Sequence, residues 1–294
     1  MLHKKILMSA ESSINNKSRF NVYLTPSLIF FGIIIALILS FQNEEASVFP
    51  KFISDQFTFT AWVNEGEDYL RKHFRWFTKI IANYIKSGYY FIEDFLIDSP
   101  WILVVSILFL PCLVTGGLGL GLYSLFTMYF WGATGMWDES LQTVGLMGLS
   151  VTLCVFFGVI LGTLCSQSNK FLNFMSPILD TMQVMPAFVY LFPAVFFFGI
   201  GGAPAILATM IYAMPPIIRL TNSGIRQVPA ETIESATSFG SNKLQLLFKI
   251  KIPLSLPSIM MGVNQVIMMA LALVVLACFI GAEGIGGQVW LAIR

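Results

Sequence analysis

Charged side chains are scarce in this sequence. They make up 11% of the 294 residues, whereas 56% of the residues are hydrophobic and the mean hydropathy is +0.76. A soluble globule of this size needs more charge to cover its surface, so a lipid environment explains the composition best. The formal net charge of +1 excludes the strongly basic surface typical of proteins that bind nucleic acid.

Residues for metal or nucleophilic chemistry are also few. The two histidines, His3 and His73, lie in polar stretches, and the four cysteines lie within or beside apolar runs without zinc-ligand spacing. A membrane enzyme with acid–base or metal chemistry is therefore disfavoured, and we expect no metal or other cofactor in this chain. No G-x-x-x-x-G-K-[ST] motif occurs, so any ATP must be bound by a separate subunit.

Long apolar runs are what the sequence has instead. A helix needs about 20 apolar residues to cross a bilayer, or fewer when flanking side chains reach the interface. The sequence predicts an all-α, polytopic bundle of about seven spans, with a tight turn at Gly116 and Gly117. The predicted spans are 24–41, 101–116, 118–133, 144–165, 184–201, 203–218 and 258–281.

Lysine and arginine predict the orientation of the spans, because they collect on the cytoplasmic side. The segment 219–257 holds five basic and two acidic residues, and the tail 1–23 is also basic. An even number of predicted spans separates the two segments, so both are predicted to be cytoplasmic, with 131–142 outside. The run 24–41 has the basic flank of a signal peptide but no cleavage site after Phe41, so we expect a retained additional N-terminal helix.

The segment 42–99 is predicted to lie along the outer membrane interface. It has six basic and nine acidic residues among aromatic side chains such as Trp62 and Trp76. Interfacial helices keep such rings in the headgroup layer and their charges in water. A small soluble subdomain is the alternative, although about 58 residues is marginal for an independent core. Residues 100–294 then form the main transmembrane domain.

The cytoplasmic loop 219–257 has local structure of its own. Pro229 can begin a helix, because its missing N–H would be unpaired there, and Gly240 can end one in a left-handed conformation. The sequence therefore predicts a short helix from Pro229 to Phe239.

A second short helix is predicted to follow in the same loop. Ser241 or Asn242 can cap it, and Pro253 is expected to end it. Its apolar stripe consists of Leu244, Leu247 and Phe248. Because helices this short are barely stable alone, the stripe predicts a docking surface for a partner protein. A plain loop held by its own turns is the alternative.

The pattern of this loop, Glu234-Ser235-Ala236, Gly240 and Ile250-Lys251-Ile252-Pro253, resembles the EAA loop of binding-protein-dependent ABC importer permeases. Ser235 replaces the first of the family's usual alanines, which is a small-for-small change. The resemblance implies that the loop forms coupling helices that sit in a groove of the ATPase subunit. The residues expected to take part are Glu234, Ser235, Ala236, Gly240, Leu244, Leu247, Phe248, Ile250 and Pro253.

Further stretches resemble the glycine betaine/proline betaine permeases of that family. They are Asp180-Thr181-Met182-Gln183, Pro186 to Leu191, Pro215 to Leu220, Gln227 to Ala230 and Gly262-Val263-Asn264-Gln265. The likeness runs from about Asn64 to Arg294 and implies the type I ABC importer permease fold in the bacterial inner membrane. It also implies two permease copies, two ATPase subunits and a periplasmic or lipid-anchored substrate-binding protein. Family members continue with a further span, so we expect this sequence to stop one helix short.

Gln183, Asn264 and Gln265 are polar residues that lipid would penalise within the predicted spans. They are candidates for lining the solute pathway, with interhelical hydrogen bonding as an equal alternative. We interpret Asp180 as a helix cap rather than a substrate contact.

Small and aromatic residues in the spans favour packing roles. Gly158 and Gly162 form a small-x-x-x-small pair, which predicts close helix contact. The aromatic residues could contribute to a cation–π cage, but packing or lipid contact is the preferred interpretation. They are Phe188, Tyr190, Phe192 and Phe196 to Phe198.

Two other classes of transport protein compete with this interpretation. A channel or secondary transporter usually has charged residues within its spans, and 144–165 and 258–281 have none. The chain is therefore interpreted as the permease subunit, not an enzyme, of an ATP-driven importer for glycine betaine, proline betaine or a similar osmoprotectant. A permease for choline, carnitine, a sulfonium osmolyte or an amino acid is the alternative.

Overall fold

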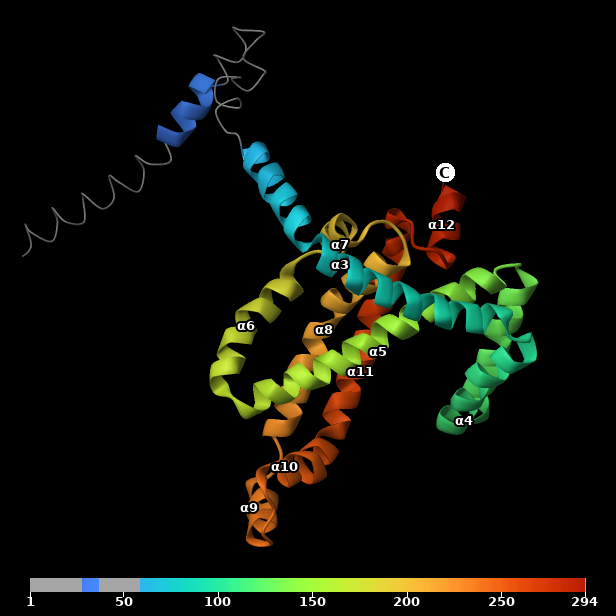
Figure 1. Ribbon diagram of the computed structural model, residues 1–294, viewed down its shortest axis with the longest axis vertical. Helices are drawn as coiled ribbons and strands as arrows, with labels where there is room; N and C mark the ends of the chain where they lie inside the picture. Colours follow the sequence, from blue (N-terminus) through green and yellow to red (C-terminus); the bar gives the residue numbers. More distant parts are fainter. Residues whose placement is uncertain (1–27, 37–58, 294) are drawn as a thin grey trace, which may run out of the picture. The chain divides into compact units, whose positions relative to one another are not determined.

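The computed structural model describes residues 28–36 and 59–293 (Figure 1). Every regular element within these ranges is a helix, as the all-α prediction requires. The chain divides into two compact units, 1–70 and 71–294. In the first, residues 28–36 form a helix whose side chains are mostly exposed. The predicted tail 1–23 lies outside the described residues.

Helix α3 (Phe59–Asp98) accounts for most of the predicted interfacial segment, of which 42–58 is not described. Aromatic side chains stand exposed along it, among them Trp76, Tyr84 and Phe91. The Lys86 ammonium lies 5.4 Å from the ring centroid of Tyr90. Rings and cations thus share one long helix, as at a membrane interface.

Helix α4 (Trp101–Ala133) is a hairpin of two short arms. Gly117 has the non-helical dihedrals φ 71° and ψ −171°. A Cβ placed at Gly121 would lie 3.4 Å from the Cβ of Leu113 and 3.1 Å from Cε2 of Phe109. Residues eight positions apart in a straight helix are separated by about 12 Å, so the second arm folds back on the first. The turn predicted at Gly116 and Gly117 is confirmed.

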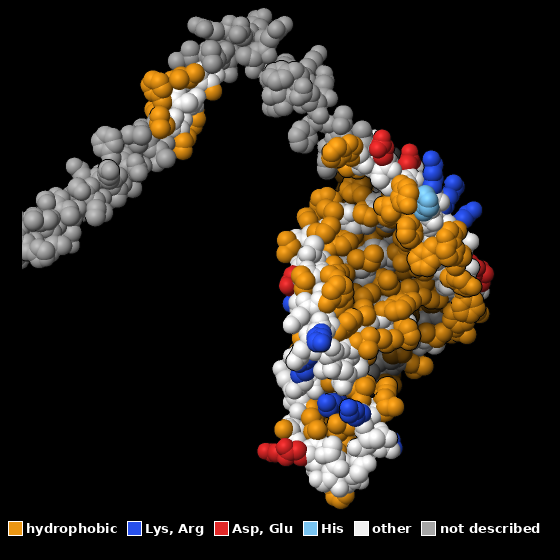
Figure 2. All heavy atoms as spheres, turned by 60° about the vertical axis from the view of Figure 1, so that its left-hand side comes forward, with side chains coloured by type: hydrophobic (Ala, Val, Ile, Leu, Met, Phe, Trp, Pro, Cys, Tyr) orange, Lys and Arg blue, Asp and Glu red, His pale blue; other side chains and the backbone are white. Residues whose placement is uncertain are grey.

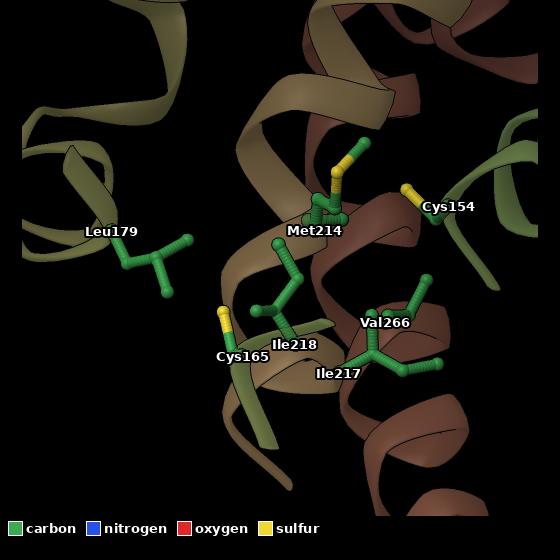
Figure 3. Close-up of a cluster of buried hydrophobic side chains, with 8 residues drawn as sticks. Cys154, Cys165, Leu179, Met214, Ile217, Ile218 and Val266 are labelled. Carbon is green, nitrogen blue, oxygen red and sulfur yellow. The ribbon is translucent and has the colours of Figure 1, made fainter. Parts of the chain in front are cut away.

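The core of the second unit is built from α5 (Trp137–Gln167), α8 (Gly202–Arg226) and α11 (Ile252–Leu276). Helix α5 crosses α8 and α11 in Figure 1 and packs against both. A Cβ at Gly158 would lie 2.2 Å from Cγ2 of Ile217, which confirms the close packing predicted for this glycine. The buried cluster in Figure 3 includes Cys154, Cys165, Leu179, Met214, Ile217, Ile218 and Val266.

The span predicted at 184–201 is wrong in its bounds. Helix α6 (Asn169–Val184) runs before it, and the 3₁₀ turn η2 (Ala187–Tyr190) and α7 (Leu191–Phe198) continue at a bend of 112°. Pro186 explains the break, because it lacks an N–H and holds the preceding residue in an extended conformation. Polar residues in α6 kept this helix from being recognised as part of an apolar run.

The remaining elements complete the second unit. Glycines with φ of 85° and 119°, Gly199 and Gly201, separate α7 from α8, at the break that the sequence predicts. Helix α8 continues to Arg226, eight residues beyond its predicted end. After the short elements of 230–251 and α11 come the 3₁₀ turn η4 (Ala277–Ile280) and α12 (Ile285–Ile293).

The number of spans is not confirmed as seven. Within the described residues, four helices are long and apolar enough to cross a membrane, or five if the bent pair of α6 and α7 counts as one span. The α4 hairpin counts there as one helix, whereas the sequence predicts two spans in it. The span 24–41 is described only at residues 28–36.

Candidate functional site

The first helix after α8, α9 (Ala230–Ser238), begins and ends close to the predicted bounds. Pro229 is its N-cap residue, and Gly240 follows it with φ 82°. The Gly240 N–H donates to the Thr237 carbonyl at 2.9 Å, and the Ser241 N–H donates to the Ala236 carbonyl at 3.1 Å. These two bonds form a Schellman motif, which fixes the direction in which the chain leaves α9.

Asn242, rather than Ser241, caps the second helix, α10 (Lys243–Leu246). The Gln245 N–H donates to Oδ1 of Asn242 at 2.8 Å, and the Asn242 N–H donates to Oε1 of Gln245 at 3.0 Å. This reciprocal pair is a capping box, so the turn between α9 and α10 is held on both sides.

The prediction that Pro253 ends the second helix is wrong. A π-turn, η3 (Leu247–Lys251), joins α10 to α11, and Pro253 lies in the first turn of α11. The Ile252 N–H bonds to the Leu247 carbonyl, five residues back. The wider turn relieves the clash that a proline ring makes with the carbonyl four residues before it. Residues 230–251, called the coupling segment below, are thus continuous with a core helix.

Large apolar side chains stand exposed on the coupling segment. Leu244 is 67% exposed and Phe248 63%, whereas Leu247 is half-buried. Phe239, which the sequence analysis did not single out, is 89% exposed. In Figure 2 the lower tip of the second unit, formed by α9 and α10, lies below a group of Lys and Arg side chains. Large exposed apolar side chains in a segment that also has basic residues suit a protein partner better than water.

The other predicted coupling residues lie beside this tip. Ser235, Ala236 and Ile250 line one hollow between α9 and the π-turn, together with Phe239. The exposed Glu234 accepts hydrogen bonds at its carbonyl from the hydroxyls of Thr237 and Ser238. The structure therefore brings the predicted residues of α9 and the π-turn together.

Arg226, the last residue of α8, joins two core helices just before the coupling segment, and its role was missed in the sequence. Its Nη2 donates to the carbonyl of Cys165 at 2.8 Å, and its Nε donates to Oδ1 of Asn222 at 2.9 Å. The side chain thereby joins the last turns of α5 and α8, where a cation is favoured by the helix dipoles. The signal in the sequence was a basic residue shortly before Pro229.

The candidate pathway residues are all exposed. Gln183 lies on α6, and Asn264 and Gln265 lie on α11. Asp180 is not a helix cap, because the N-cap of α6 is Ser168, whose Oγ accepts from the Phe171 N–H. Asp180 instead forms an ion pair with Arg219 of α8.

The aromatic run of α7 does not form a cage for a cation. Phe196, Phe197 and Phe198 line a pocket that also contains the cationic side chains of Arg75 and Lys79 from α3. Two cations at the same pocket would repel a quaternary ammonium group. The packing interpretation therefore fits this run better.

Three known transport permeases are similar in sequence to most of this chain. Glycine betaine/proline betaine transport system permease protein ProW of Escherichia coli (strain K12) is 37% identical over 249 residues, 84% of this chain and 70% of that protein. Glycine betaine transport system permease protein OpuAB of Bacillus subtilis (strain 168) is 46% identical over 175 residues, 60% of this chain and 62% of that protein. Glycine betaine/carnitine transport permease protein GbuB of Listeria monocytogenes serotype 1/2a (strain 10403S) is 38% identical over 239 residues, 79% of this chain and 84% of that protein.

The family model of the binding-protein-dependent transport system inner membrane component matches residues 155–294. The chain belongs to this family. The match contains α8, the coupling segment and α11, which are the elements that the functional argument uses.

As a binding-protein-dependent permease, the chain lies in the inner membrane and transports rather than catalyses. Permeases of this kind work with an ATPase and a substrate-binding protein. The ATPase acts from the cytoplasm, so the permease needs a cytoplasmic docking surface. The coupling segment is the candidate for that surface.

Proposed function

We propose that this chain forms the solute pathway of an ATP-driven importer for glycine betaine, proline betaine or a similar quaternary ammonium osmoprotectant. The names of the three relatives support this class, because each includes glycine betaine. A permease for another small solute is the second candidate, favoured by the carnitine in one of those names. Ligand binding by the partner binding protein, measured across betaines, choline, carnitine and neutral amino acids, separates the two.

The coupling segment is proposed to dock on the ATPase. The observation that carries this proposal is the exposed apolar tip of Phe239, Leu244 and Phe248 on two capped turns. Glu234 and Gly240 would set the shape of the segment, and the apolar side chains, Leu247 included, would pack on the ATPase. Because Arg226 joins α8 to α5, a displacement of α9 would reach both helices.

Two permease copies and two ATPase subunits are proposed for the complete importer. We further propose that residues 1–23 form a cytoplasmic tail, 24–41 an additional span and 42–99 an external interfacial segment. The exposed rings of α3 support the last assignment.

The coupling role is tested with Gly240→Val in the importer reconstituted with its ATPase and binding protein. At φ 82° a β-branched side chain costs about 1–2 kcal/mol, so solute-stimulated ATP hydrolysis and uptake should fall about tenfold. Glu234→Lys should also reduce both rates. Gly148→Val is the matched control, because a side chain at Gly148 meets open space. Unchanged assembly with unchanged hydrolysis in both test variants would remove the coupling role.

A further inference from the structure

The Asp180–Arg219 ion pair lies on a face that the chain itself leaves open. The two side chains are 63% and 43% exposed, respectively. Their immediate neighbours, Leu179 and Ile218, are each only 1% exposed and pack in the core between α6 and α8. The pair thus sits beside the α6–α8 contact rather than inside it, with its charged atoms accessible.

The position of the pair along its helices rules out a lipid environment. Asp180 lies eleven residues after the start of α6, and Arg219 lies seven residues before the end of α8. At 1.5 Å per residue these positions are about 16 Å and about 10 Å from the cytoplasmic ends of the helices. Exposed charges at such depth face protein or a water-filled cavity in membrane proteins, because hydrocarbon excludes them.

Other polar side chains continue from the pair along the same helices. Gln183 lies one turn beyond Asp180 on α6 and is exposed. Asn222 and Ser223 lie one turn beyond Arg219 on α8 and are half-buried. A polar track therefore runs from Gln183 past the pair toward the cytoplasmic end of α8, which is where a solute pathway would leave the membrane.

We propose that the Asp180–Arg219 ion pair is a gate in the inner half of the solute pathway. The proposal rests on the proposed transport function. The pair holds α6 against α8 in the closed state and separates when α8 is displaced. Only Gln227, Val228 and Pro229 lie between α8 and α9, so a movement of the coupling segment reaches Arg219 through a short connection.

An exposed ion pair suits a gate that must open in every cycle. In a water-filled pathway, water solvates part of both charges, so separating them changes the free energy little. A buried pair would be far costlier to separate, since each charge would lose its partner in a medium of low dielectric constant. The exposure of Asp180 and Arg219 thus fits reversible opening driven by the ATPase.

The test compares wild type, Asp180→Asn, Arg219→Gln and the charge swap Asp180→Arg/Arg219→Asp in vesicles with the ATPase and binding protein. Each single change should raise ATP hydrolysis without solute and lower the uptake per ATP about two- to fivefold, the range expected for one exposed ion pair. The charge swap should bring that ratio back to within about twofold of wild type. Lys170→Gln, an exposed charge on the same helix, is the matched control.

The possible outcomes separate the gate from the transport function. Absence of ATP-dependent uptake by wild type would contradict the proposed function, whereas the gate is judged by the ratio of uptake to hydrolysis in each variant. Wild-type ratios in both single variants overturn the gate. A second result also overturns the gate. In it, each single change abolishes assembly of the complex, and the charge swap restores assembly but not the ratio of uptake to hydrolysis. The pair would then be a contact between subunits. If neither single variant folds, the swap decides, because it keeps both charges.

Discussion

Two glycines determine how closely α5 and α8 approach each other. A Cβ at Gly162 would lie 2.6 Å from the Cβ of Thr221 and 2.7 Å from the backbone carbonyl oxygen of Ile218. A backbone oxygen cannot rotate away as a side chain can, so the two helices would have to separate. Gly158 makes a similar contact with Ile217 one turn earlier.

We therefore predict that Gly162→Val destabilises the protein by about 1–3 kcal/mol, as expected for overpacking of a core. The measurement is the thermal unfolding midpoint of the purified chain in detergent. Gly148→Val is the control, because Gly148 lies on the same helix with no atom within 4 Å of its added Cβ. Both changes alter the intrinsic helix propensity of α5 by the same amount, so equal midpoints would contradict the packing argument.

For single residues, the sequence alone predicts some structural roles and misses others, and the reasons are physical. The roles of Gly158 and Gly240 followed from local rules for small residues and for left-handed turns. Arg226 and Phe239 were missed, since their significance depends on what lies near them. Arg226 bonds to a carbonyl 61 residues away in the chain, and the exposure of Phe239 follows from the direction in which Gly240 turns the chain.

Among the elements, α3 packs on α5 through a buried carboxyl group. Glu93 of α3 is 6% exposed, and within the described part of the chain neither its Oε2 nor the nearby Tyr89 hydroxyl makes a hydrogen bond of regular geometry. Burial raises the pKa of Glu93 above its ordinary value of 4.5, and the nearby Glu283 and Asp94 raise it further. Gln142 of α5 and the Tyr89 hydroxyl oppose that rise by favouring the charged form.

The raised pKa sets the sign of a pH dependence. The folded state binds the Glu93 proton more tightly than the unfolded state does. Protonation of Glu93 therefore stabilises the folded state, and this contribution to the free energy of unfolding is complete below the ordinary carboxyl pKa. It is lost as the pH rises through the raised value. We predict that Glu93→Gln unfolds at a higher temperature than wild type, and that the difference grows as the pH rises above about 5. Thermal unfolding from about pH 5 to about pH 8 measures this difference.

The exposed neighbour Asp94 supplies the control for that experiment. Asp94→Asn removes a carboxylate from the same turn of α3 without removing a buried one. It should shift the unfolding midpoint by less than Glu93→Gln at every pH. Parallel curves for wild type and Glu93→Gln would show that the Glu93 carboxyl does not titrate in this range.

Prolines account for most errors in predicting the elements. Pro186 interrupts the apolar run 184–201, which by composition alone is one span, and Pro253 lies within α11 rather than ending the helix before it. The first case follows from the local preference for an extended residue before proline. The second depends on the π-turn ahead of Pro253, because the wider turn lets the helix continue through the proline, and propensity rules for single residues do not predict such a turn.

For the molecule as a whole, contacts between distant segments fix which helix ends lie together. The first turns of α5 meet the segment after η4, because Gln142 donates to Glu283 at 3.1 Å and Gln288 donates to Glu139 at 2.7 Å. The Gly201 N–H, just before α8, donates to the carbonyl of Ile280 at 3.0 Å. The beginnings of α5 and α8 thus lie at one end of the core.

The opposite ends of α5 and α8 also lie together, joined by Arg226 and the Cys165 carbonyl. The chain leaves α5 at that end and enters α8 at the other, so α6 and α7 must return across the full length of the core despite their bend of 112°. We therefore expect three crossings, by α5, the bent pair and α8, between Thr134 and Thr237. An odd number of crossings would put these two residues on opposite sides of the membrane.

We predict that Thr134→Cys reacts with a membrane-impermeant maleimide in intact cells, and that Thr237→Cys reacts only in inside-out vesicles. The half-buried Cys112 and Cys278 are replaced by alanine in both variants so that only the new thiol is accessible, since Cys154 and Cys165 are buried. Reaction of both new thiols from the same side would mean that the bent pair re-enters without crossing. Thr237→Cys reacting in intact cells would place the coupling segment outside, where no ATPase could reach it.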